Sequence, residues 1–170
     1  MPTKIKDVRP PHGLTRLLMR CPIWLFHMHL GWMVGERFLL LTHTGRNSGV
    51  PRQTILEVLQ HETASDAYYV LSGWGGKADW LRNVEKTPEV IITVGRRQLH
   101  AHAERLGSEA AERAILAYAK QNPLAIRVLP RMMGYRLDGS EEDFRALAHL
   151  GIVVAFRPTL AVGEKGALEQ

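Results

Sequence analysis

The sequence predicts an α+β fold in which about six mostly antiparallel strands form a small closed or split β-barrel with helices at its sides. Short apolar or alternating stretches recur at 37–44, 52–60, 67–72, 90–94, 98–106 and 152–156. Most of them are joined by short turns rich in glycine, asparagine or aspartate, which indicates hairpins and therefore antiparallel pairing. Stretches with helical periodicity lie between the strands.

The turns and helices follow from local residue types. Glycine and asparagine over 44–49 predict the first hairpin turn, and similar signals predict turns at 64–66 and 95–96. A short helix is expected from Asp79, as its N-cap, to Lys86. Further helices are expected over 108–120, over 124–133 and from Ser140. In 98–106, apolar and polar residues alternate, which is typical of a strand with one face in water.

Residues 13–33 have apolar side chains at helical spacing and predict an amphipathic N-terminal helix. Pro22 is expected to begin a second helical piece, because proline is tolerated in a first turn. Two interpretations stay open. The helix packs on the core, or its basic residues hold it on an anionic membrane surface.

The bulk composition fits one domain. We expect a flexible N-terminus over 1–12, a single split-barrel domain over 13–160 and a tail over 161–170 in this chain of 170 residues. The single cysteine, Cys21, excludes an internal disulfide framework and fits a small core residue. With no signal peptide and no apolar stretch long enough to span a bilayer, a cytoplasmic location is expected, with membrane association through 13–33 as the open alternative.

The positive charge is concentrated at one end of the chain. Residues 1–37 hold six Lys/Arg against two acidic residues, and residues 107–170 are balanced. A nucleic-acid-binding surface would instead show clustered Lys/Arg with interleaved aromatics or a reading motif. We therefore expect no nucleic-acid partner.

The first hairpin turn has the composition of an anion site. Glycines let a ligand approach the main chain, and consecutive N–H groups can form an anion nest. Arg46 and Arg52 add charge-assisted donors. The turn lacks the Gly-Lys-Ser/Thr ending of a P-loop, so it indicates a phosphate site of another kind or an ordinary hairpin turn.

A second glycine-rich loop follows the strand 67–72. Three glycines stand in the four positions 73–76, an arrangement that is costly in backbone entropy. A planar ring lying against the main chain would explain it, and so would a tight turn before a helix. On that helix, Trp80 either walls a ring pocket or sits in the core, and Asn83 either bonds a ring edge or caps a strand.

Other chemistries lack support in the sequence. His100 and His102 share a strand face, but no third ligand has recognisable spacing, so no metal site is expected. The nucleophile elbow of serine hydrolases is absent.

Taken together, these segments resemble the deazaflavin-dependent nitroreductase family, a family of split β-barrel (FMN-binding-like) oxidoreductases that use reduced coenzyme F-420. The resemblance covers roughly residues 36–106. It is carried by Leu39 to Arg52, Val70 to Gly76, Asp79 to Asn83, Pro88 to Val90 and the strand pair that ends at Leu106. The sequence departs from the family pattern at two places. The loop after Gly76 is shorter than in many members. Position 57 is Glu, where some nitro-reducing relatives have an aromatic residue near the substrate.

The resemblance implies roles for particular positions. The phosphate and the start of the acidic tail of the coenzyme would be bound by Thr44, Gly45, Arg46, Asn47, Ser48, Gly49 and Arg52. The deazaflavin ring would be lined by Ser72, Gly73, Trp74, Gly75 and Gly76. Lys77 would add positive charge near the tail or phosphate, and the pocket would be closed by Trp80 and Asn83. Such barrels often pair, so a homodimer is an implied expectation.

The function expected from this resemblance is hydride transfer from coenzyme F-420 to a small electron-poor acceptor: a quinone, enone, imine or nitro compound. The candidate proton donors are Tyr118, Ser72 and His43. FMN is the rival cofactor, because split barrels also bind it. A barrel that holds a cofactor, haem or lipid without catalysis is the alternative from another functional class.

Overall fold

The computed structural model describes residues 3–4, 28, 35–73, 75–122, 135–136, 142, 145 and 151–159. Several predictions therefore concern residues outside this description: the N-terminus and helix over 1–33 apart from 3–4 and 28, Trp74, the helix 124–133, the helix from Ser140 apart from 142 and 145, and the tail 161–170.

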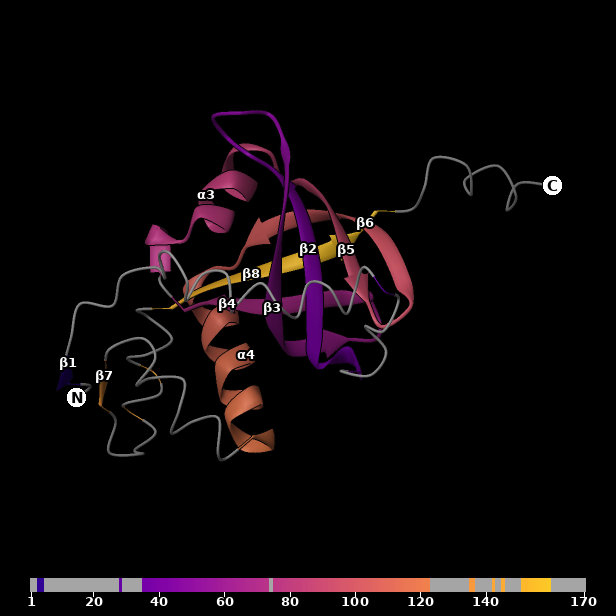
Figure 1. The fold of residues 1–170 in the computed structure, drawn as a ribbon. Coiled ribbons are helices and arrows are strands. Elements are labelled where there is room, and N and C mark those ends of the chain that lie inside the picture. The colour runs from indigo at the N-terminus through magenta and orange to yellow at the C-terminus, as the bar shows by residue number, and fades with distance from the viewer. Residues whose placement is uncertain are drawn as a thin grey trace.

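The described residues form a closed antiparallel barrel in the strand order β2-β3-β4-β8-β6-β5 (Figure 1). The strands are β2 (Phe38–Thr44), β3 (Pro51–Glu62), β4 (Ala67–Ser72), β5 (Glu89–Val94), β6 (Arg97–Arg105) and β8 (Ile152–Pro158). A separate two-stranded pair joins β1 (Thr3–Lys4) to β7 (Tyr135–Arg136). The prediction of a barrel of six mostly antiparallel strands is confirmed.

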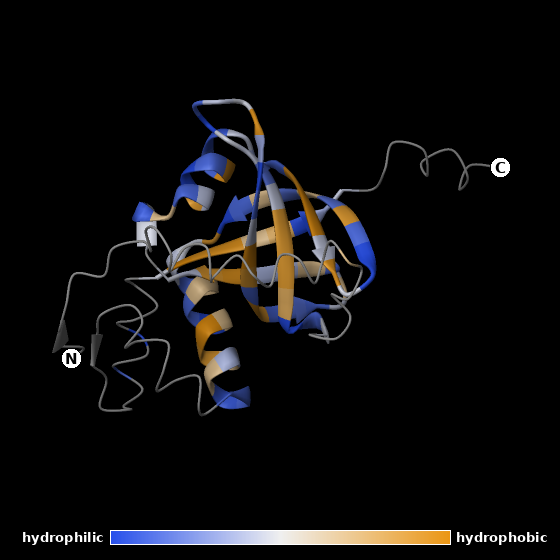
Figure 2. Ribbon diagram, viewed as in Figure 1, coloured by the Kyte–Doolittle hydropathy of each residue, from blue (hydrophilic) through white to orange (hydrophobic). Residues whose placement is uncertain are grey.

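Alternation along the strands creates the barrel core. In β2, Leu39 and Leu41 are fully buried in the same core cluster as Val70 of β4 and Ile92 of β5. Figure 2 shows the resulting mixture of hydrophobic and hydrophilic bands along the strands. On β6, Ala101 and Ala103 are buried while the alternating His100, His102 and Glu104 are exposed, as the sequence predicts.

Two helices pack on the barrel at different places. Helix α3 (Asp79–Lys86) follows the short 3-10 helix η2 (Gly75–Lys77), and its buried Trp80, Leu81 and Val84 join the inner core cluster. Helix α4 (Ser108–Gln121) packs in a second cluster against residues of β3, β4 and β8. In Figure 1, α3 lies beside the tip of the β2–β3 hairpin and α4 runs below the barrel.

One local prediction about α3 is wrong. The N-cap is Ala78, which has no side-chain capping hydrogen bond, and Asp79 is the first helical residue. The carboxylate of Asp79 instead forms an ion pair with Arg46 of the β2–β3 loop. Its charge still lies in the first turn, where a negative side chain stabilises a helix.

Candidate functional site

The loop between β2 and β3 is a tight turn held by its own backbone. The amide of Gly45 donates to the carbonyl of Val50 at 2.9 Å, and the amide of Gly49 donates to the carbonyl of Gly45 at 2.8 Å. Gly49 has a φ of 67°, a left-handed conformation that glycine adopts without strain. Asn47, Ser48 and Gly49 are exposed at the tip, and Thr44 pairs with Pro51 at the base.

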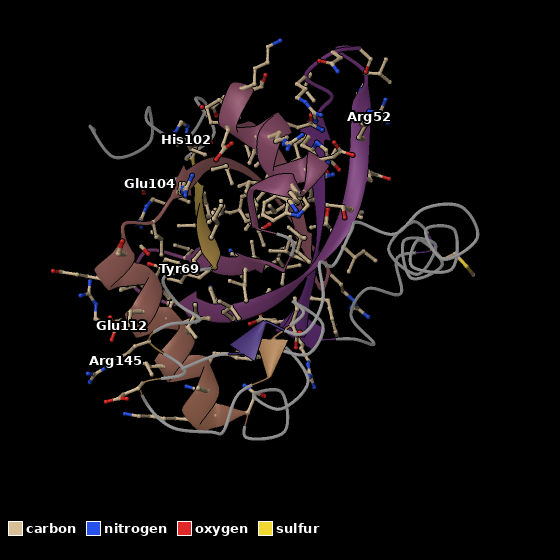
Figure 3. All side chains as sticks on the ribbon, turned by 90° about the vertical axis from the view of Figure 1, so that its left-hand side faces the viewer. Arg52, Tyr69, His102, Glu104, Glu112 and Arg145 are labelled. Atoms are coloured by element: carbon tan, nitrogen blue, oxygen red, sulfur yellow. The ribbon has the colours of Figure 1, made fainter. Side chains whose placement is uncertain are left out.

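Gly45 is required because Arg52 lies against it. A Cβ atom at position 45 would lie 2.7 Å from Oγ of Ser48 and 2.9 Å from Nε of Arg52. The guanidinium of Arg52 is exposed, and within the described ranges no carboxylate pairs with it. Figure 3 shows Arg52 on the β3 arm of the hairpin. The loop thus places an exposed cation, Arg52, against its own buried Gly45, which Ser48 and Arg52 cover.

Arg46, the other predicted phosphate ligand, is bound to α3. Its Nη2 lies 3.0 Å from Oδ1 of Asp79, and its Nη1 donates to Oδ1 of Asn83 at 3.1 Å. The backbone amide of Arg46 donates to the same Asn83 oxygen at 3.1 Å, and the Nζ of Lys86 donates to the Arg46 carbonyl at 2.7 Å. These bonds fix the hairpin loop on the helix.

His43 continues this network into the barrel. It is 5% exposed, and its Nδ1 lies 3.1 Å from Nδ2 of Asn83. Burial, and then the positive charge of Arg52, lower the pKa of His43 to about 4, so the ring is neutral at neutral pH. A neutral imidazole in this position is suited to accepting the Asn83 hydrogen bond rather than to supplying a proton.

The second glycine-rich loop is anchored at both ends. Ser72 is fully buried, and its hydroxyl donates to the carbonyl of Gly75 at 2.8 Å. Nε of Arg82 donates to the carbonyl of Gly76 at 2.9 Å. Gly75 has a φ of 53°, a left-handed conformation, and a Cβ atom added at Gly73 would meet nothing within 4 Å.

The remaining residues of this second region divide between surface and core. Lys77 is exposed on η2. Trp80 is 6% exposed, and the centroid of its ring lies 6.4 Å from the ring centroid of Phe156, so its indole belongs to the barrel core. The two loops are joined through α3, because Asp79 and Asn83 contact the first loop and Arg82 contacts the second.

Sequence reasoning missed Lys86 and the partners of Tyr118. Lys86 lies three residues after Asn83, so helical spacing could have placed both on one face. Tyr118 of α4 is 5% exposed, and its hydroxyl donates to Oε1 of Glu57 at 2.7 Å. Arg37 contacts the same oxygen at 3.1 Å. Burial, and then the Glu57 bond, raise the pKa of Tyr118 to about 12.

The strand register relates the polar cluster of Arg37, Glu57 and Tyr118 to the two loops. Val58 pairs with Val70, so Glu57 lies one residue from the pair on the side toward Leu71 and Ser72. Glu57 is five residues from Arg52 along β3, about 17 Å at the rise of an extended strand. On β3, Glu57 thus lies beside the β4 residues that lead into the second loop, and the exposed Arg52 lies at the far end of the strand with its side chain on the opposite face.

The described residues contain no group of three or more metal-ligating side chains that could hold an ion. Among the same residues, none of the helices is both long and apolar enough to span a membrane.

Comparisons with known proteins agree with this fold and assign the family. The family described as F420H(2)-dependent quinone reductase matches residues 28–125. A comparison with curated protein sequences gives no significant match.

Solved structures share the fold at low sequence identity. A structure described as an F420-H2 dependent reductase (FDR-A) has a TM-score of 0.52 and 20% identity, over 72% of this chain and 96% of that one. One described as a domain-swapped dimer has a TM-score of 0.53 and 18% identity, over 85% and 100%. The protein Atu2129 from Agrobacterium tumefaciens, of unknown function, has a TM-score of 0.52 and 17% identity, over 88% and 59%.

The described barrel carries the predicted glycine-rich loops on its rim, and the family match spans both loops and all of α4. The chain therefore belongs to the F420H(2)-dependent quinone reductase family and is an oxidoreductase of the class that depends on reduced coenzyme F-420.

Proposed function

We propose that this chain transfers a hydride from reduced coenzyme F-420 to a quinone, with its two glycine-rich loops binding the coenzyme. The observation that carries the proposal is that Arg52, at the base of the β2–β3 loop, is exposed and has no carboxylate partner among the described residues. A guanidinium binds a phosphate through fork-shaped, charge-assisted hydrogen bonds. The exposed tip residues Asn47 and Ser48 add further polar groups beside it.

The charges around the loops fit an anionic coenzyme. Five cationic side chains belong to residues 44–52 at the loop end of the hairpin, η2 and α3: Arg46, Arg52, Lys77, Arg82 and Lys86. Against them stand Asp79, paired with Arg46, and Glu85, which lies 3.5 Å from Arg105. The surplus of positive charge favours a ligand with a phosphate and an acidic tail, and salt would screen this attraction.

In this proposal the second loop lies along the deazaflavin ring. Its chain direction is fixed by the Ser72–Gly75 and Arg82–Gly76 hydrogen bonds, and its glycines allow a flat ring to approach the backbone. When bound, the reduced coenzyme supplies the hydride.

We place the acceptor beside Glu57 and Tyr118. Reduction of a quinone to a hydroquinone takes one hydride and one proton, so a group that handles hydrogen bonds to oxygen is required near the ring. Tyr118 stays protonated at neutral pH, and Glu57, which is half-buried, connects it to solvent-exposed Arg37. The family description favours a quinone over the enone, imine and nitro acceptors.

Turnover tests the proposal directly. The purified chain is mixed with reduced coenzyme F-420 and either a benzoquinone, a naphthoquinone or a nitroarene, and oxidation of the coenzyme is followed by its visible absorption. We expect quinones to be reduced at least about tenfold faster than the nitroarene, a difference of about 1.4 kcal/mol in barrier. Equal rates, or faster nitroarene reduction, would contradict the quinone assignment, and no turnover with any acceptor would contradict the enzymatic function.

A further inference from the structure

The side-chain amide of Asn83 has only one orientation that satisfies its neighbours. Its Oδ1 lies 3.1 Å from the backbone N of Arg46 and 3.1 Å from Nη1 of the same residue, and both of these groups can only donate. The oxygen must therefore face Arg46. The Nδ2 group then faces Nδ1 of His43 at 3.1 Å and donates to it.

This orientation fixes the protonation of His43. Since Nδ1 accepts a hydrogen bond, the ring proton is on Nε2 and the imidazole is neutral. The surroundings of the ring agree with that state. Burial, and then the charge of Arg52 on β3, lower the pKa of His43 and favour the neutral ring. The Thr44 backbone and Asp79 of α3 raise this pKa, but less strongly. Asn83 is itself 3% exposed, so water does not replace these bonds easily.

The same network gives the two arginines of the β2–β3 loop different surroundings. Arg46 is committed to α3 by its guanidinium, its amide and its carbonyl, which meet Asp79, Asn83 and Lys86. Arg52 makes no ion pair within the described part of the chain, and it is exposed. A ligand anion could reach Arg52 without breaking a bond, whereas it would have to displace a carboxylate from Arg46.

We propose that Asn83 is a positioning residue that holds the β2–β3 loop through Arg46, so that Arg52 is the arginine that meets the anionic group of the coenzyme. This inference rests on the proposed function, and it changes the roles that the resemblance gave to Asn83 and Arg46. Both act on the coenzyme through the shape of the loop. Exposed Arg52 then provides the contact with the coenzyme, and buried Gly45 lets it lie close to the loop.

A double-mutant cycle on coenzyme binding tests this division. The dissociation constant of coenzyme F-420 is measured by fluorescence quenching for Asn83→Ala, Arg46→Ala, Arg52→Ala and the relevant pairs. We expect about tenfold weaker binding for Asn83→Ala and no further loss when Arg46→Ala is added, because both substitutions break the same hydrogen-bonded attachment of the β2–β3 loop to α3. Asn83→Ala combined with Arg52→Ala should lose less than the product of the two single losses, because Asn83 acts by positioning the loop that carries Arg52. Arg52→Ala alone should weaken binding more than Arg46→Ala.

Three results would overturn the proposal. One is a loss for Asn83→Ala with Arg46→Ala that equals the product of the single losses, which would make the two residues independent. Another is a larger loss for Arg46→Ala than for Arg52→Ala, which would make Arg46 the direct ligand. The third is unchanged binding in Asn83→Ala.

Amide hydrogen exchange of the free protein separates this inference from the proposed function. The Arg46 amide should exchange at least about tenfold faster in Asn83→Ala, while Asn83→Asp, which keeps the accepting oxygen, should retain protection. If the wild-type chain does not bind coenzyme F-420, the proposed function and this role of Asn83 toward the coenzyme are both wrong, whatever the exchange rates. If it binds and the Arg46 amide exchanges equally in all three proteins, only the positioning role is wrong.

Discussion

Replacing Gly45 with alanine gives the sharpest structural test of the hairpin loop. The new methyl group would lie 2.7 Å from Oγ of Ser48, 2.9 Å from Nε of Arg52 and 3.2 Å from the carbonyl of Val50. The carbonyl cannot move freely, because it accepts the Gly45 amide at 2.9 Å. Inserting a methyl group into such a space costs about 1–3 kcal/mol of folding free energy. It also pushes Arg52 away from the loop.

Urea unfolding and a coenzyme titration measure the two consequences. With a slope near 2 kcal/mol per molar urea, a loss of about 2 kcal/mol moves the midpoint down by about 1 M. Gly107→Ala is the matched control, because nothing lies within 4 Å of a Cβ there, although alanine is a poorer N-cap than glycine and costs up to about 1 kcal/mol. Coenzyme F-420 should bind at least about tenfold more weakly to Gly45→Ala. An unchanged midpoint together with unchanged binding would refute this role of Gly45 in the loop.

Three further predictions concern single groups. Tyr118→Phe removes a 2.7 Å hydrogen bond to Glu57 and should lower the free energy of unfolding by about 1–2 kcal/mol in urea, and it should slow quinone reduction; equal stability would show that the bond contributes nothing. Because the unfolded chain protonates His43 near 6.5 and the folded chain only near 4, lowering the pH between these values should reduce stability by up to about 3 kcal/mol, and His43→Gln should lose correspondingly less in the same range. Arg52→Ala should weaken the salt dependence of coenzyme binding, since one screened charge contact is lost; an unchanged dependence would place the anion elsewhere.

The parts of the fold that depend on local sequence could be predicted. The hairpin turn at 44–49 and the turn at 95–96 follow from glycine and asparagine, and both appear in the structure, where Gly49 and Gly95 have left-handed backbone angles. The alternating residues of β6 predict which face is buried because a strand has a side-chain period of two. These signals need no knowledge of distant residues.

The partners of the site residues could not be predicted in this way. Arg46 and Asn83 are 37 residues apart, and Tyr118 and Glu57 are 61 apart, so only the closed barrel brings them together. Asp79 illustrates the same limit. Its position before a helix predicts an N-cap, but its carboxylate pairs with Arg46, which the fold places beside it.

Trp80 shows how one residue type supports two interpretations. An indole near a glycine-rich loop fits both a ring pocket and a core, and the packing of α3 on the barrel decides for the core. Where the quinone lies, and whether two chains pair, stay predictions.

The most direct test is a parallel titration of the wild-type chain with coenzyme F-420 and with FMN, followed by tryptophan fluorescence, and repeated with Arg52→Ala. We predict micromolar or tighter binding of the deazaflavin, at least about tenfold weaker binding of FMN, and at least about tenfold weaker binding of the deazaflavin in the variant, each tenfold corresponding to about 1.4 kcal/mol. Tighter binding of FMN, or deazaflavin binding that is equal in wild type and Arg52→Ala, would contradict the assignment of the two loops to coenzyme F-420.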